Sequence, residues 1–160
     1  MNIRSATKAD MAQIFQLEQA AFGAHCYPDF LFRQLWELWP HYLLVAEQES
    51  DLDVEGVEIK GEAVSQLVGF VLGGMGEVRH QGWIMSLAVA EQARGGGIGK
   101  KLLQQLIDKL TQDGCQQLRL TVHPDNSAAS LYHALGFEHE STEVDYFGPN
   151  EPRHVLVRSA

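Results

Sequence analysis

The chain has 160 residues, 45% of them apolar, and a formal net charge of −9 at neutral pH. This length fits a single domain spanning residues 1–160, since domains commonly run to roughly 100–200 residues. The acidic balance argues against the basic surface that sequence-independent nucleic-acid binding requires, so we expect no nucleic-acid partner.

Hydrophobicity and cysteine usage indicate a cytoplasmic protein. No run of about 18 apolar residues is present to span a membrane, and the first residues are too polar for a secretory signal. Cys26 and Cys115 lack the spacing of a disulfide framework or a zinc site. We therefore expect reduced thiols, no bound metal and no membrane partner.

Apolar residues recur at helical spacing in some segments of the chain and form strand-like runs in others. In chain order they predict helices over residues 11–22, 29–38, 98–110 and 126–135, and strands over residues 42–46, 67–72, 83–89, 118–122, 137–147 and 154–158. The strand at 83–89 is apolar on both faces, which is typical of a central strand. The sequence therefore predicts a mixed α/β domain with a strand-rich C-terminal part.

An acidic segment, residues 47–62, follows the first of these strands. It holds seven acidic residues and one lysine, so most of the net negative charge lies here and the rest of the chain is nearly balanced. Strongly charged segments bury too little apolar surface to form a core of their own. We expect a solvated hairpin extension or loop here, in preference to an acidic binding site.

A glycine-rich turn joins the strand at 83–89 to the helix that follows it. Four of its residues are glycines: Gly95, Gly96, Gly97 and Gly99. Backbone amides at such a turn lack internal partners and point outward, and the helix dipole adds positive potential, so the turn can bind phosphate. Arg94, Lys100 and Lys101 add formal positive charge.

The spacing of the glycines narrows the choice of phosphate ligand. The mononucleotide pattern G-x-x-x-x-G-K-S/T fails, because Arg94 stands at its first glycine and Lys101 at its hydroxyl residue. The dinucleotide pattern G-x-G-x-x-G fails as well, because its third glycine would be Lys100 or Leu102. The turn does match R-x-x-G-x-G, from Arg94 to Gly99.

A second block lies at residues 126–137, with the sequence NSAASLYHALGF. With the first block, it resembles the GNAT superfamily of N-acetyltransferases, whose turn motif is Arg/Gln-x-x-Gly-x-Gly/Ala. The second-block positions that match the family pattern are Asn126, Ala129, Leu131, Tyr132, Gly136 and Phe137. The resemblance covers the chain best from about residue 83 to the C-terminus. It implies a GNAT-type domain with a mixed sheet of about six to seven strands, about four flanking helices and a V-shaped opening between central strands for acetyl-CoA.

The resemblance also implies the residues that bind acetyl-CoA as co-substrate. Backbone groups of the central strand would hold the pantetheine arm, the turn would hold the pyrophosphate, and an asparagine would contact the pantetheine. These residues are Leu87, Ala88, Val89, Arg94, Gly95, Gly96, Gly97, Ile98, Gly99, Lys100 and Asn126. Asn126 also suits a helix N-cap, and both roles are compatible.

Tyr132 stands where the family has its general acid. A phenol with a pKa of about 10 can protonate a leaving thiolate whose thiol has a pKa of about 8.5. The attacking amine must arrive neutral, so a base is expected, and Glu77 and His123 are the candidates, ahead of His80 and Ser86. Relatives place acceptor-binding residues in two segments that here contain Tyr27, Trp36 and Tyr146.

These features predict an acetyl-CoA-dependent N-acetyltransferase that works by direct attack in a ternary complex, since neither cysteine lies near the expected acetyl position. The residues at 146–152 resemble those of ribosomal-protein N-terminal-amine acetyltransferases, so the expected acceptor is a peptide or protein N-terminus. A small amine such as a polyamine or aralkylamine is the second choice, and a non-catalytic acyl-CoA-binding domain or a nucleotide hydrolase are the competing classes. A monomer or a homodimer fits the sequence.

Overall fold

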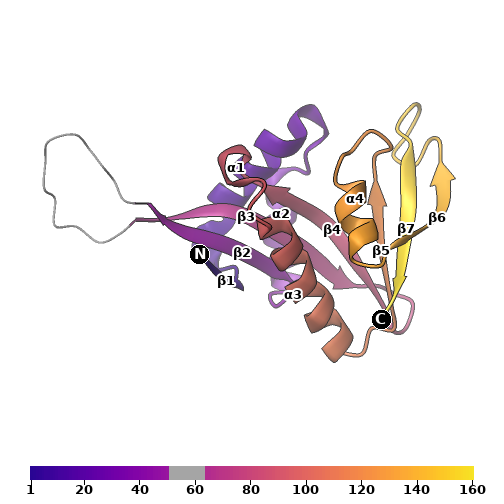
Figure 1. Ribbon diagram of the computed structural model, residues 1–160, viewed down its shortest axis with the longest axis horizontal. Coiled ribbons are helices and arrows are strands. Elements are labelled where there is room, and N and C mark those ends of the chain that lie inside the picture. The colour runs from indigo at the N-terminus through magenta and orange to yellow at the C-terminus, as the bar shows by residue number, and fades with distance from the viewer. Residues whose placement is uncertain (51–63) are drawn as a thin grey trace, which may run out of the picture.

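The computed structural model describes residues 1–50 and 64–160 (Figure 1), and most of the acidic segment at 47–62 lies outside the described residues. These residues form a seven-stranded mixed sheet with the strand order β1-β2-β3-β4-β5-β7-β6. The strands are β1 (Asn2–Ser5), β2 (Leu43–Ser50), β3 (Val64–Met75), β4 (Gln81–Val89), β5 (Gln117–Val122), β6 (Glu138–Glu143) and β7 (Arg153–Ser159). The helices are α1 (Met11–Phe22), α2 (Asp29–Leu38), α3 (Ile98–Gln112) and α4 (Ala129–Ala134), with short 3-10 turns at Lys8–Asp10, Gly23–His25 and Glu91–Ala93.

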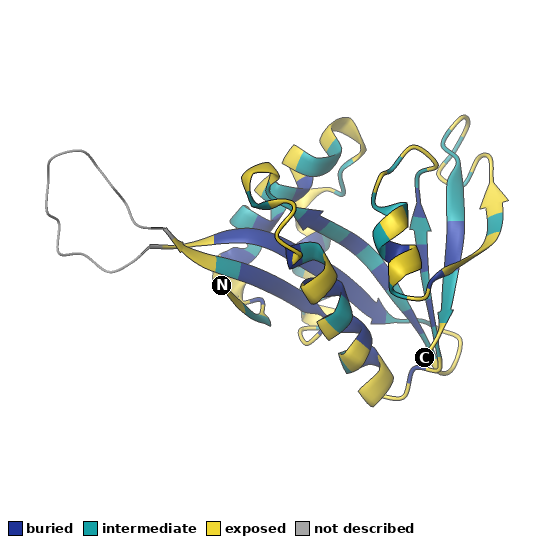
Figure 2. Ribbon diagram, in the orientation of Figure 1, coloured by how far each residue is buried: buried dark blue, intermediate teal, exposed yellow. Residues whose placement is uncertain are grey.

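The sheet divides the hydrophobic core into two layers. Helices α1 and α2 pack on one face with Phe32 and Phe70 at the centre, while α3 and α4 pack on the other with Leu106 and Phe137. Figure 2 shows the central strands buried between these layers and the outer helix faces exposed. Burial on both faces explains why the central strands read as nearly continuous apolar runs.

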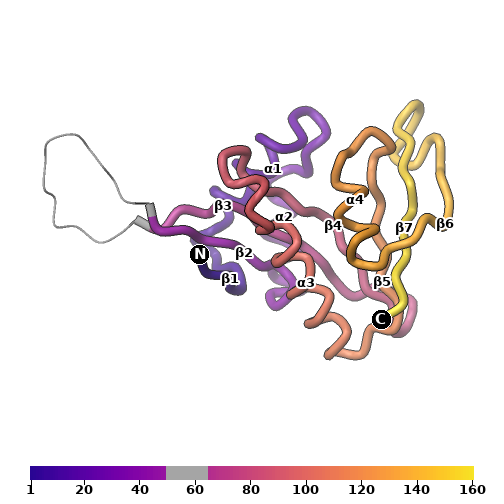
Figure 3. Tube along the Cα trace, viewed as in Figure 1, coloured from indigo at the N-terminus to yellow at the C-terminus, as the bar shows by residue number. Residues whose placement is uncertain are grey.

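Helix α3 shows how the sequence pattern produces this packing. Its buried residues recur at helical spacing: Ile98, Leu102, Leu103, Leu106, Ile107 and Leu110. The helix ends before Gly114, whose φ of 101° continues the chain in a left-handed conformation that glycine adopts without strain. Figure 3 shows the chain passing from β4 through α3 to β5, the connection that makes these two strands parallel.

The parallel strands β4 and β5 separate part-way along their length. Their pairing runs from Gln81–Gln117 to Ile84–Leu120 and stops there, although β4 continues to Val89. A bulge lies at the same point, because Leu72 of β3 pairs with Ser86 whereas Gly73 pairs with Ile84. Bulges bend a strand and increase its twist. The result is the V-shaped opening between central strands that the family resemblance implied.

Several element boundaries differ from the sequence-based expectation, among them those of β3, α4 and β6. Strand β3 continues through Gly74 to Met75, and Gly74 lets it pass close to Trp39, since a Cβ there would come within 2.6 Å of that ring. Helix α4 starts at Ala129 instead of 126, since Asn126 forms a turn in which its Oδ1 accepts from the Ala128 amide. Strand β6 ends at Glu143 instead of 147, where a turn closed on Asp145 begins.

Across the two described stretches, no helix combines the length and apolarity needed to cross a bilayer. Both cysteines are free thiols, Cys115 buried and Cys26 half-buried.

Candidate active site

Two cavities adjoin where β4 separates from β5. The larger has a volume of about 730 Å³ and lies along the end of β4, the glycine-rich turn and the start of α4. The smaller, of about 590 Å³, lies between α1, the open end of β5 and the segment before β7. Both are lined by Ala21, Phe22, Leu87 and Asn126, so these residues mark their junction.

The glycine-rich turn presents a row of free backbone donors to the larger cavity. Within the described part of the chain, no hydrogen bond has its donor in the backbone amide of any residue from 95 to 100. The first helical bond of α3 runs from the Lys101 amide to the Gly97 carbonyl. Gly97 has a φ of 76°, which turns the chain into the helix while leaving these amides exposed. The turn therefore has the geometry of an anion site at a helix N-terminus.

The sequence-predicted cofactor residues converge on this larger cavity. All of them except Gly96 line it. Arg94 and Lys100 supply positive charge, and the Arg94 Nε donates to the Val89 carbonyl at 3.1 Å, which fixes its guanidinium beside the end of β4. Gly96 lies in the turn but does not line the cavity, and a Cβ at this position would come no closer than 3.8 Å to the Ala93 carbonyl oxygen.

Asn126 has both of the expected features. Its Oδ1 accepts a hydrogen bond from the Ala128 amide at 2.9 Å and so stabilises the turn that leads into α4. Asn126 lines both cavities, and its side-chain nitrogen, Nδ2, donates to no protein group among the described residues. The structural role thus leaves the Nδ2 donor available to a ligand.

Tyr132 lies on α4 with its side chain in the smaller cavity. The residue is buried, and its ring packs edge-on against that of Phe137, with 6.1 Å between the ring centroids. Burial raises the pKa of the phenol to about 12. Over residues 1–50 and 64–160, the Tyr132 hydroxyl has no hydrogen-bond partner. A protonated hydroxyl with no internal acceptor is suited to donate to a group bound in the cavity.

The two candidate bases occupy different places. His123 lines the smaller cavity, where its Nδ1 accepts from the Asp125 amide at 3.1 Å. In the neutral ring the proton then lies on Nε2, so neither nitrogen offers a free lone pair to an amine. Glu77 lies with His80 in the exposed turn between β3 and β4 and lines neither cavity. Glu77 precedes β4 and lies near the end of that strand opposite Leu87. The structure therefore gives no support to Glu77 as a base.

The expected acceptor residues are likewise separated. Tyr27 lines the smaller cavity, and burial raises the pKa of its phenol, as do the nearby Glu18 and Tyr146. Tyr146 stands behind the cavity wall, packed edge-on against the lining residue Phe147 at 4.8 Å. Trp36 does not reach the cavity: it packs in the α1–α2 layer, and its Nε1 donates to the Ala6 carbonyl at 3.1 Å.

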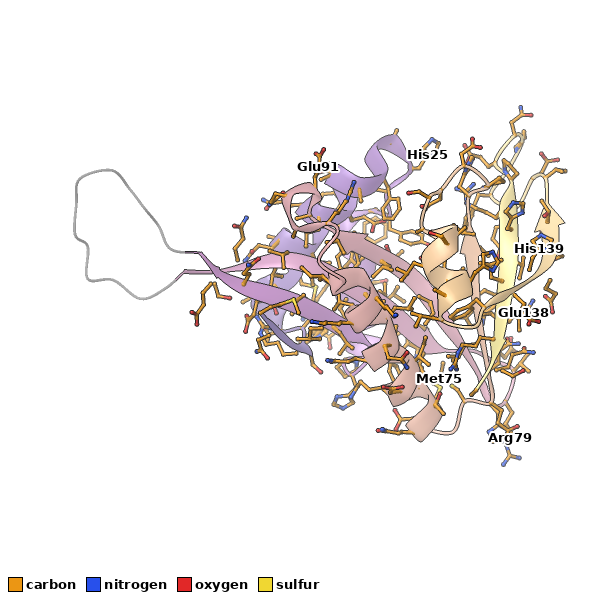
Figure 4. All side chains as sticks on the ribbon, viewed as in Figure 1. His25, Met75, Arg79, Glu91, Glu138 and His139 are labelled. Atoms are coloured by element: carbon orange, nitrogen blue, oxygen red, sulfur yellow. The ribbon has the colours of Figure 1, made fainter. Side chains whose placement is uncertain are left out.

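Two loops meet at this smaller cavity. His25, labelled in Figure 4, lies in the 3-10 turn after α1, and its Nδ1 is 3.6 Å from the Glu151 Oε1. Glu151 also pairs with Arg153 at 3.4 Å. All three residues line the cavity, so polar side chains from the two loops meet there.

Glu18 is a cavity residue that the sequence reading did not select. It lies on α1 with an exposed fraction of 2%, accepts from the Ser86 hydroxyl at 2.6 Å and accepts from the Tyr27 amide at 3.0 Å. Burial raises the pKa of this carboxyl, although both hydrogen bonds act to lower it. The signal was present in the sequence, because Glu18 follows the buried Ile14 by four residues and so shares the inward face of the helix.

Comparison with known proteins decides the family. The acetyltransferase (GNAT) family model matches residues 11–137, which include both motifs and most of the lining of the two cavities. The chain belongs to the GNAT family of acetyltransferases. This confirms the resemblance, the fold class and the reaction class expected from the motifs, N-acetyl transfer from acetyl-CoA.

Individual relatives agree with this assignment. N-alpha-acetyltransferase 30 of Saccharomyces cerevisiae is 31% identical over 115 residues, which cover 69% of this chain; the match spans 60% of the yeast protein's own length. Ribosomal-protein-alanine N-acetyltransferase from Brucella melitensis superposes with a TM-score of 0.76 at 25% identity, covering 100% of both chains. A chain of the NatC complex bound to Gag peptide and CoA superposes with a TM-score of 0.81 at 24% identity, covering 99% of this chain and 98% of its own.

Proposed function

We propose that this GNAT protein transfers the acetyl group of acetyl-CoA to the α-amine of a peptide or protein N-terminus. The observation that carries the proposal is the junction of the two cavities at Leu87 and Asn126. One cavity has the donors for a diphosphate, and the other has the acid and the room for an acceptor. The names of the relatives, N-alpha-acetyltransferase 30 and ribosomal-protein-alanine N-acetyltransferase, favour an N-terminal amine.

The geometry supports the following placement of acetyl-CoA, whose diphosphate would lie on the amides of residues 95–100. The pantetheine would run along the edge of β4 that has no strand partner beyond Ile84, as an added strand would. Asn126 would donate its Nδ2 to this arm. The thioester would then reach the junction beside Leu87, whose backbone amide could polarise the acetyl carbonyl.

Direct transfer fits the residues around that junction. The amine nitrogen attacks the acetyl carbon, the C–S bond breaks, and the thiolate takes the proton of the Tyr132 hydroxyl, while the proton that the attacking nitrogen gives up returns to the Tyr132 oxygen. Among the described residues no cysteine lines either cavity, and the Cys115 thiol lies instead against the Met75 sulfur at 3.2 Å. A covalent acetyl-cysteine intermediate therefore has no nucleophile at the thioester.

The smaller cavity favours an α-amine as the acceptor. Two carboxylates, Glu18 and Glu151, line it and attract a cationic group. An α-amine has a pKa of about 7.7–8.0 and loses its proton easily near neutral pH, whereas a lysine side chain has a pKa of about 10.4. A site with no strong base of its own is thus better matched to a chain N-terminus.

An acceptor screen tests the proposal. Purified protein and acetyl-CoA are incubated with peptides of varied first residues, the same peptides with blocked N-termini, and polyamines, while free thiol is measured. We expect thiol release with free N-termini and none with blocked ones. Release with polyamines alone would transfer the assignment to small amines, and tight CoA binding without release on any amine would identify a non-catalytic binding domain.

A further inference from the structure

Glu18 is a buried carboxylate at the acceptor cavity whose two oxygens are separately occupied. Oε2 accepts from the Ser86 hydroxyl at 2.6 Å, and Oε1 accepts from the Tyr27 amide at 3.0 Å. Ser86 precedes Leu87, the residue at the junction of the cavities, and it lines the smaller one. Helix α1, the loop after it and the open end of β4 are therefore joined through one carboxyl group.

The hydrogen bond to Glu18 fixes the polarity of Ser86. A serine hydroxyl has one proton and two lone pairs. An ionised carboxylate can only accept, so in that state of Glu18 the serine proton is committed to it and the hydroxyl presents only lone pairs to the cavity. A group that contacts the Ser86 oxygen must then donate a hydrogen bond. An amine can do so through its N–H, whereas a carbonyl cannot.

We propose that Glu18 holds Ser86 as the hydrogen-bond acceptor that orients the attacking amine. The proposal rests on the proposed N-acetyltransferase function and concerns the acceptor half of the same site. Ser86 receives one N–H of the amine, which turns the nitrogen lone pair toward the thioester beside Leu87. Ser86 contacts the substrate, whereas Glu18 acts through it as a positioning residue.

The charge of Glu18 also acts on the reaction itself. As the amine attacks, its nitrogen becomes positive before it loses a proton, and a nearby buried anion stabilises that charge. Other titratable groups also face the same cavity: His25, Tyr27, His123, Tyr132, Glu151 and Arg153. Of the two carboxylates in the cavity, only Glu18 is buried, since Glu151 is half-exposed and paired with Arg153.

The variant Glu18→Gln tests this polarity. Its amide has nearly the same shape, and its oxygen can still accept from the Tyr27 amide, but its nitrogen must donate to Ser86. The Ser86 proton then turns to the cavity, so the oxygen that met the amine as an acceptor now meets it as a donor. We expect kcat/KM for the peptide to fall roughly 10- to 100-fold, as for loss of a hydrogen bond to a charged group, with the CoA dissociation constant unchanged.

A double-mutant cycle separates positioning from general damage. Ser86→Ala removes the acceptor, and we expect the Glu18→Gln/Ser86→Ala double variant to be no worse than Glu18→Gln alone. Glu138, labelled in Figure 4, lies on the exposed strand β6, and the matched change Glu138→Gln should leave turnover unchanged. Independent, multiplying losses from the two single variants would overturn the proposal, as would wild-type turnover by Glu18→Gln.

The pH profile gives a readout that a purely structural role would not move. Protonation of the acceptor amine gives log kcat/KM a slope of one at low pH. In the wild type, protonation of Glu18 reverses the Ser86 hydrogen bond, and the slope rises toward two. In Glu18→Gln it should stay at one, and a slope of two in this variant would contradict the proposal. If the wild type turned over no amine at all, the proposed function would fail instead, which the acceptor screen detects separately.

Discussion

Ile84 on β4 and Leu120 on β5 form the last pair of the parallel ladder at the centre of the sheet. Beyond this pair the strands continue without bonding each other, as far as Val89 and Val122. An unpaired strand edge inside a sheet is a row of free donors and acceptors, which sheets normally avoid. Here both cavities lie along this edge, so one break in pairing creates the space beside Leu87 that the two cavities share.

Replacing Gly97 with alanine should damage the phosphate turn. A Cβ at Gly97 meets no atom within 4 Å, but the φ of 76° is unfavourable for alanine. We expect a loss of about 1 kcal/mol in the free energy of unfolding and weaker CoA binding, because relief of the strain would rotate the turn amides. Thermal unfolding and calorimetric titration with CoA measure both effects.

The matched control is Gly96→Ala in the same turn. Gly96 has no positive φ, and its Cβ would come no closer than 3.8 Å to any other group, so stability should be kept. Equal destabilisation by the two alanines would mean that the left-handed conformation at Gly97 is not what the turn requires.

Lys100 and Lys101 provide a charge test at neighbouring positions. Lys100 lines the larger cavity, whereas Lys101 is exposed and does not line it. We expect Lys100→Ala to weaken CoA binding roughly threefold at low salt, the size of an exposed ion pair, and less at high salt because of screening. Lys101→Ala should bind CoA as the wild type does. A larger loss with Lys101 than with Lys100 would place the phosphates elsewhere.

Tyr132→Phe should lower kcat by about 100-fold or more while leaving CoA affinity and folding nearly unchanged, since the hydroxyl bonds to no described residue. The phenol must be protonated to act as an acid, and its pKa of about 12 keeps it protonated through the usual assay range. The rate should therefore not decline between pH 8 and pH 10 through Tyr132. Stopped assays of kcat against pH for both proteins check this, and a Tyr132-dependent decline near pH 9 would contradict it.

The parts of the molecule that the sequence predicted best are those that depend on local chain geometry. In the strand at 83–89, the glycine-rich turn and α3, the conformation follows from the residues of the segment itself. The same holds for the block at 126–137. Helical and strand periods likewise placed most elements within a few residues.

The parts that the sequence did not predict depend on register and on distant packing. Glu77 was expected in the site because it precedes the central strand, and Trp36 because relatives place acceptor-binding residues in its segment. In the structure Glu77 lies at the opposite end of β4, and Trp36 packs inward. Glu18 lines the cavity because the inward face of α1 packs against β4. Its contact there is with Ser86, which is 68 positions away in the sequence. The acceptor, the cytoplasmic location, the oligomeric state and the roles of individual site residues stay predictions.

Stability against pH provides a separate test of Glu18. Burial raises the pKa of its carboxyl in the folded protein above the unfolded value, so the folded state holds this proton more tightly. By linkage, the group favours folding most at low pH, and this contribution is lost as the pH rises from the unfolded pKa through the folded one. Above the folded pKa the ionised, buried Glu18 therefore costs stability.

Glu18→Gln should accordingly unfold at a higher temperature than the wild type at pH 7, and the difference should shrink as the pH falls toward the unfolded pKa, because the folded carboxyl takes up its proton first. Calorimetric melts of the two proteins between pH 4 and pH 8 measure this. Glu138→Gln, on the exposed strand β6, is the control and should follow the wild type at every pH. A Glu18→Gln variant that is less stable at pH 7 than at pH 4, relative to the wild type, would show that the charged carboxylate stabilises the fold.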